Sequence, residues 1–94
     1  VCGNKDRFLP ESLEEYWVQD VSAAIQNILL GVVDLGLGAC WEGVYPQKIF
    51  LQKLSQILNL PNNHIPLAVI SIGYADEEAT PRTQYDINKI HYIK

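Results

Sequence analysis

Residues 17–46, WVQDVSAAIQNILLGVVDLGLGACWEGVYP, decide the fold of this chain. Apolar residues recur there at the i, i+3, i+4 and i+7 spacing of an α-helix, which we expect to begin near Asp20 and to end at Gly36. The residues that carry this spacing are Val21, Ile25, Ile28, Leu29, Val32 and Val33. Further apolar or small residues cover much of the opposite face, namely Ala23, Ala24, Leu30 and Gly31. A helix without a polar face must be buried on every side, so we expect it to pack against neighbouring subunits or polypeptide outside these 94 residues.

The segments around this helix alternate between strands and helices. In chain order we expect a strand over residues 1–3, a loop or short helical turn over 4–15, the apolar helix, a buried strand over 39–45, an amphipathic helix over 47–58, a strand over 65–72, a surface loop over 74–86 and an extended tail over 87–94. The apolar run of residues 65–72 is typical of a strand inside a sheet. The tail is suited to joining another sheet edge. Helices between the strands favour parallel pairing, although the tail leaves the full sheet open.

Composition restricts the function classes. The chain has 94 residues, 48% of them hydrophobic and 19% charged, which predicts one globular domain at most. A net charge of −4 without a basic cluster argues against a nucleic-acid surface. No uninterrupted apolar run reaches the roughly 18 residues that a membrane span needs, and no secretory signal opens the chain. We therefore expect a cytoplasmic protein whose cysteines, Cys2 and Cys40, are reduced and buried rather than bridged.

The sequence contains no methionine and starts with Val-Cys-Gly, which resembles the end of a strand. Two explanations fit: the N-terminus was processed, or these residues form the back part of a longer protein. We favour the second, because the apolar helix also requires a partner surface.

No pattern of catalytic or metal-binding side chains is found. His64 and His91 are far apart and neither has a second ligand at helical or turn spacing, so we expect no zinc site. The serines lack a His/Asp partner, and neither a G-x-S-x-G motif nor a phosphate-binding loop is present. Gly36, Gly38 and Gly43 do not match the G-x-G-x-x-G fingerprint.

The turn between Gly36 and Pro46 is the remaining candidate. Small residues follow the helix, and Trp-Glu-Gly then stands at a strand end, where a flat ligand can approach the backbone closely. Gly43 would expose its amide there. The alternative is a tight turn with Trp41 in the core and no ligand. A further hypothesis, a generic small binding module for another flat ligand, has only this turn to support it.

An ordered set of motifs covers essentially the whole chain and resembles the C-terminal half of the FMN-dependent nitroreductase family. The matching segments are VCG at 1–3, W-x-x-D at 17–20, AAIQNILL at 23–30, LGLGACWEGVYP at 35–46, LNLP at 58–61, IPLAVISIGYA at 65–75, Tyr85-Asp86 and Lys89-Ile90-His91-Tyr92. The resemblance implies that residues 1–94 form the C-terminal half of a nitroreductase-like α+β domain, with a mixed sheet and a long buried interface helix.

The resemblance also implies a function. It predicts a homodimer with FMN at its interface, in which NAD(P)H delivers hydride to flavin N5 and the electrons then pass to a nitroaromatic, quinone or related acceptor. The flavin carries the redox chemistry, so no catalytic side chain is required.

Site residues follow from the family motif. Glu42 and Gly43 match the strand-end pair whose backbone lies near flavin N5, where a backbone donor stabilises the charge of reduced flavin, and Trp41 would flank the same pocket. Arg82 matches the first of two basic residues that meet the FMN phosphate. The second position is Gln84, a neutral residue that makes a weaker contact. A plain surface role for Arg82 is the alternative.

The family's Arg-rich N-terminal motif has no counterpart in these residues, so the chain holds roughly half a flavin site. Three explanations stay open: proteolysis that leaves a separate N-terminal fragment bound, a truncated gene product, or a chain that is part of a larger expressed protein. The alternative function is a truncated, non-catalytic relative that acts only as a dimerising or structural partner.

Overall fold

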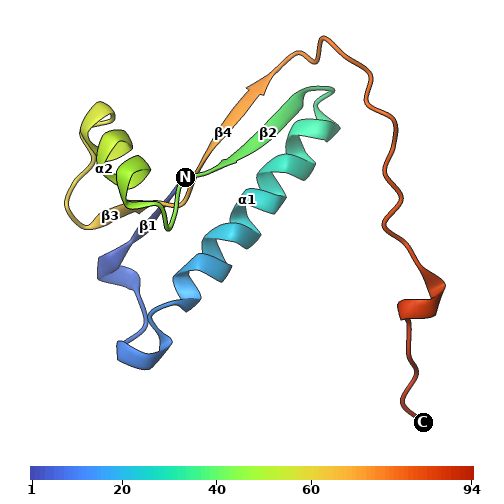
Figure 1. Cartoon of the computed structure of the whole chain (residues 1–94), viewed down its shortest axis with the longest axis horizontal. Helices are drawn as coiled ribbons and strands as arrows, with labels where there is room; N and C mark the ends of the chain where they lie inside the picture. Colours follow the sequence, from blue (N-terminus) through green and yellow to red (C-terminus); the bar gives the residue numbers. More distant parts are fainter.

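The computed structural model describes residues 1–94 and has an α+β architecture (Figure 1). The strands are β1 (Cys2–Asn4), β2 (Gly38–Gly43), β3 (His64–Pro66) and β4 (Ala68–Gly73), and the α-helices are α1 (Tyr16–Asp34) and α2 (Lys48–Ile57). Single 3-10 turns η1 (Lys5–Arg7), η2 (Glu11–Leu13) and η3 (Ile87–Lys89) complete the set. The first two lie in residues 4–15, where we expected a loop or a short helical turn. Helix α2 agrees with the predicted amphipathic helix to within one residue at each end.

The strand pairing is antiparallel throughout, so the expectation of parallel pairing is wrong. β1 pairs with β3, and β2 pairs with β4 from Gly38↔Gly73 to Gly43↔Ala68. Parallel pairing requires that a connecting helix crosses the face of the sheet. α2 instead lies near one end of the β2–β4 pair, beside β1 and β3, so the chain turns back antiparallel (Figure 1).

A β-bulge divides the strand that we predicted over residues 65–72. The amides of Leu67 and Ala68 both donate to the carbonyl of Val1, at 2.9 and 3.4 Å. Two residues therefore oppose one, which adds twist and ends the pairing with β1. β3 and β4 consequently belong to separate two-stranded sheets.

Helix α1 starts at Tyr16, four residues before the predicted start near Asp20. Its first turn includes Trp17, which is 5% exposed and packs into the core, whereas no side chain caps the helix. The predicted glycine stop is confirmed: α1 ends at Asp34, and Gly36 has φ +72°, a left-handed conformation that favours glycine.

Only one stripe of α1 is covered by this chain. Ile25 and Val32 are buried with Trp17, whereas Leu30 and Val33 are 61% and 71% exposed. The single chain therefore does not bury α1 on every side. The total accessible surface, 8144 Å², also exceeds the roughly 5500 Å² expected of a folded monomer of this mass.

An aromatic cluster joins β1, α1 and the segment after β2. Trp17 stacks on Phe8 with ring centroids 5.1 Å apart and meets Tyr45 edge-on at 5.0 Å. Gly3 is buried against Trp17, because a side chain at this position would collide with the indole ring. The sequence pattern did not reveal this cluster, since its members lie far apart in the chain.

The cysteines are free, but their predicted burial is only partly correct. Cys2 is half-buried, whereas Cys40 is exposed within this chain. Cys40 belongs to β2, and five of the six residues of β2 are exposed, so this strand is not buried as we predicted. The sheet is too narrow for either strand to be interior.

Candidate functional site

The end of β2 presents the backbone of Gly43 at an open sheet edge. In an antiparallel ladder, successive residues of a strand point their N–H and C=O groups to opposite edges. Ala68, which lies opposite Gly43, exchanges its backbone hydrogen bonds with Val1 on its other side, at 2.8 and 3.4 Å. The Gly43/Ala68 pair is thus not hydrogen-bonded. The Gly43 N–H points away from β4 and can donate to a ligand.

The space around Gly43 is open as well. No atom lies within 4 Å of the position that a Cβ would occupy there, and the backbone is not in the left-handed region. A larger residue would therefore fit the chain itself. Glycine is required at this position only if something outside the chain comes close to the backbone.

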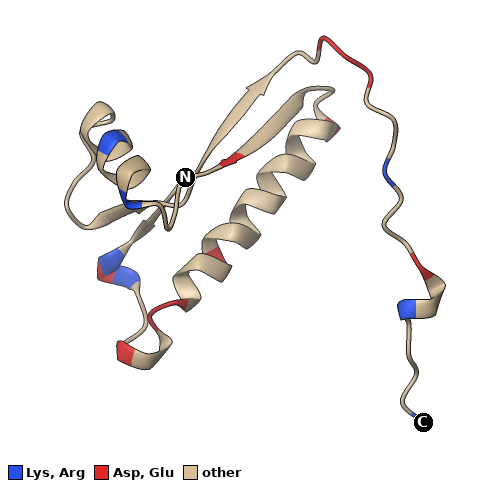
Figure 2. Ribbon diagram, in the orientation of Figure 1, with Lys and Arg blue, Asp and Glu red and all other residues tan.

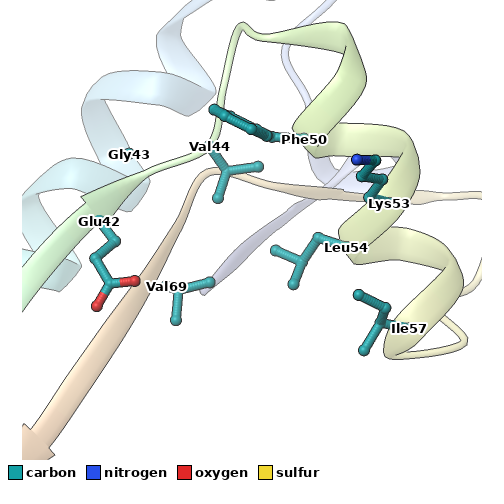
Figure 3. Close-up of a pocket in the computed structure, with 8 residues that line it drawn as sticks. All are labelled: Glu42, Gly43, Val44, Phe50, Lys53, Leu54, Ile57 and Val69. Atoms are coloured by element: carbon teal, nitrogen blue, oxygen red, sulfur yellow. The ribbon is translucent and has the colours of Figure 1, made fainter.

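A cleft of about 380 Å³ lies beside this strand end, between the β2–β4 pair and α2 (Figure 3). Its walls are mainly apolar, with one residue of each charge, and its lining residues are Glu42, Gly43, Val44, Phe50, Lys53, Leu54, Ile57 and Val69. The carboxylate of Glu42 accepts a hydrogen bond from the hydroxyl of Ser71 on β4. The cleft offers an apolar wall for a flat ring, with polar groups at its rim.

Trp41 lies on the other face of the sheet. Side chains alternate along a strand, so Glu42 faces the cleft with Val69, while Trp41 shares the opposite face with its partner Ile70. Ile70 packs against the core cluster that contains Ile25 of α1. Trp41 is 38% exposed. The structure thus brings Glu42 and Gly43 together at the cleft and places Trp41 across the sheet from them.

Arg82 and Gln84 lie on the segment that follows β4. Residues 74–94 are exposed except for Asp86, and the segment leaves the sheet and runs along the far side of α1 (Figure 1). Basic residues are found on this segment, on α2 and near the N-terminus, but none on α1, β2 or β4 (Figure 2). Within one chain, Arg82 and Gln84 are therefore not part of the cleft.

Two polar residues were missed as site residues in the sequence: Lys53, which lines the cleft, and Ser71, whose hydroxyl donates to Glu42. Ser71 lies two residues after Val69, so it shares the face of Glu42, but this relation depends on the antiparallel register. Lys53 lies on α2, and only the position of α2 brings it to the cleft.

Other polar groups have structural roles. Asn63 donates to Asp6 at 2.6 Å, and its Oδ1 lies 2.7 Å from His64 Nδ1, which ties η1 to the turn before β3. Nowhere in the chain do three or more His, Cys, Asp or Glu side chains gather as a metal site would require. None of the helices has the length and apolar character for a membrane span.

Tyr45 is the titratable group with a clear shift. Burial raises the pKa of its phenol above the ordinary value, and the charge of Glu15 and the hydrogen bond to it act in the same direction. The hydroxyl donates to Glu15 Oε2 at 3.5 Å. This interaction stabilises the aromatic cluster in the protonated state of Tyr45.

Comparisons of this chain with known proteins all point to the nitroreductase family. The family model described as "Nitroreductase family" matches residues 2–74. A protein of Methanothermobacter thermautotrophicus, named as a candidate NADH dehydrogenase/NAD(P)H nitroreductase, is 42% identical over 84 residues, which are 89% of this chain and 44% of that protein.

Solved structures show the same likeness. A Bacteroides thetaiotaomicron protein with that name superposes with a TM-score of 0.84 at 41% identity, over 98% of this chain and 51% of its own. An FMN-dependent nitroreductase of Clostridium difficile superposes at 0.80 with 28% identity, over 97% and 53%. The chain thus spans about half the length of the relatives that it matches.

Proposed function

This chain belongs to the nitroreductase family, and we propose that it supplies the Glu42–Gly43 side of an FMN site in an NAD(P)H-dependent oxidoreductase. The observation that supports this site most is the Gly43 amide, which points away from β4 at the free edge of β2, beside an open Cβ position. FMN, when bound, accepts hydride at N5 from NAD(P)H and passes electrons to a nitroaromatic, quinone or related acceptor.

The protein groups at this site bind and orient the ring. The Gly43 N–H donates a hydrogen bond toward the ring edge, as a fixed dipole that needs no reorganisation during the reaction. The missing side chain permits close approach of a flat ring. The apolar walls of the cleft next to it exclude water from one side of the site.

The remaining contacts come from a second copy in this proposal. Arg82 and Gln84 lie on a segment that extends away from the cleft of their own chain, so we assign their contact with the FMN phosphate to the site of a homodimer partner. Arg82 supplies a charge-assisted hydrogen bond and Gln84 a neutral one. The exposed apolar face of α1, with Leu30 and Val33, is the surface that the two copies share.

The spectrum of the purified protein tests this function. We expect a yellow protein whose visible flavin bands bleach with NADH. Gly43→Val should raise the Kd for FMN by about tenfold or more, because the added isopropyl group occupies the space that the ring needs. The matched control is Gly73→Val, a strand glycine with equally open surroundings at the other end of the sheet, which should leave the Kd unchanged.

Two outcomes would contradict the proposal. A colourless protein that ignores added FMN would assign this polypeptide to the alternative function, a non-catalytic dimerising partner, which the neutral Gln84 favours. A Gly43→Val protein with unchanged FMN affinity would remove Gly43 from the site.

A further inference from the structure

A second cleft, of about 370 Å³, lies between α2, the turn before β3 and the segment after β1. Its α2 residues differ from those of the cleft beside Gly43, so the two clefts use different faces of the helix. No acidic residue lines the second cleft, and its polar lining residues are Lys5, Tyr45, Gln52, Ser55, Asn62 and His64. The hydroxyl of Tyr45 already donates to Glu15, at 3.5 Å, so the other polar groups are the ones that a ligand can use.

The charge around the second cleft is opposite to that of the chain as a whole. Although the chain has a net charge of −4, residues 43–75 contain no Asp or Glu (Figure 2). All lining residues except Lys5 come from this stretch, and Lys5 adds a positive charge. The nearby acid Asp6 is engaged by the side chain of Asn63 at 2.6 Å. The second cleft is therefore suited to an anion.

A chain of hydrogen bonds fixes the tautomer of His64. A carboxylate only accepts, so Asn63 donates from Nδ2 to Asp6. Its Oδ1 then lies 2.7 Å from His64 Nδ1, which must carry the proton of the neutral ring. Nε2 of neutral His64 is consequently a hydrogen-bond acceptor. Nε2 has no partner in the chain and is not buried, so a ligand can reach it.

These groups together select an anion that also carries a hydroxyl. Lys5 attracts negative charge, and Ser55 and Gln52 can donate to oxygen atoms. Neutral His64 instead requires a donor. Hydrogen phosphate has one in its P–OH group, whereas sulfate has none.

We propose that the second cleft binds inorganic phosphate, with Lys5 at its charge and Nε2 of His64 accepting a hydrogen bond from its hydroxyl. The network of Asp6 and Asn63 then has a second role besides tying η1 to the turn, because it holds the imidazole ready for this contact. The proposal is independent of FMN.

NMR titrations at constant ionic strength test it, followed through the amide signals of Ser55, Asn62 and His64. The probes are inorganic phosphate, sulfate and methyl phosphate at pH 8. An ordinary imidazole is neutral at this pH, and of the three anions only inorganic phosphate retains a hydroxyl. We expect the Kd for inorganic phosphate to be lower than that for either other anion by about tenfold or more.

Three variants assign the contacts. Lys5→Met, at an exposed position, should raise the Kd for phosphate by about tenfold or more. His64→Phe keeps a ring but removes both nitrogens, so it should abolish the preference for phosphate over sulfate. The matched control is Lys53→Met, which removes the same charge from the other face of α2 and should change neither quantity.

Equal Kd values for phosphate and sulfate would refute the proposal. So would a preference that persists in His64→Phe, or a Lys53→Met protein that loses as much affinity as Lys5→Met, because the attraction would then belong to a diffuse positive surface. If His64→Phe does not fold, Asn63→Leu takes its place. This variant keeps His64 and releases its tautomer, so the preference should fall, and an unchanged preference would equally overturn the proposal.

Discussion

A single methyl group at Gly3 is expected to destabilise this fold. An alanine Cβ there would lie 2.9 Å from Cζ3 of Trp17, closer still to Cε3, and 3.1 Å from Cε1 of Phe8. Overpacking a core in this way costs about 1–3 kcal/mol. If the indole moves aside, its stacking on Phe8, with planes 10° apart, is also lost, at about 0.5–1.5 kcal/mol. We therefore expect Gly3→Ala to lower the free energy of unfolding by about 2–4 kcal/mol.

The assay is denaturant unfolding followed by tryptophan fluorescence. Gly73→Ala is the control, because a Cβ at Gly73 meets no atom within 4 Å. Trp17→Phe provides a second test, since it removes the ring atoms that collide, so the penalty of Gly3→Ala should shrink in this background. The predicted collision with Trp17 would be refuted if Gly3→Ala and Gly73→Ala differed by less than about 0.5 kcal/mol, or if the penalty of Gly3→Ala were unchanged in Trp17→Phe.

Two further predictions concern charge and association. The folded state raises the pKa of Tyr45 above its ordinary value of about 10. The protonated phenol therefore contributes fully to the free energy of unfolding below pH 10, and this contribution is lost as the pH rises through the pKa of the folded state. Tyr45→Phe should flatten this alkaline loss of stability in urea titrations. Ile25→Ala, at a fully buried position, should lower the free energy of unfolding by about 2–5 kcal/mol. Leu30→Ala, at a position that is 61% exposed, should change the free energy of unfolding little and weaken self-association in sedimentation experiments. If the two substitutions had identical effects on the free energy of unfolding and on self-association, the assignment of the buried and shared faces of α1 would be contradicted.

The local elements could be predicted because their signals lie in neighbouring residues. The spacing of apolar residues predicted α1 and α2, and Gly36 predicted the helix end, where a positive φ is observed. The family also followed from short motifs in order, and the family model confirms it over residues 2–74. The start of α1 was placed four residues late, because Trp17 belongs to α1 through a tertiary contact rather than a capping signal.

Periodicity and motif order, which residues a few positions apart determine, were thus sufficient for the helices, the glycine stop and the family. Pairing direction, the bulge at Leu67 and Ala68, and the faces of β2 depend on contacts between Val1, Gly43 and Ala68, which are tens of residues apart in the chain. Only the tertiary structure decided that Gly43 directs its amide to an open edge while Trp41 and Glu42 occupy opposite faces. The physical reason is that a strand alternates both its side chains and its hydrogen-bonding groups, so one residue of register determines which of them a ligand can reach.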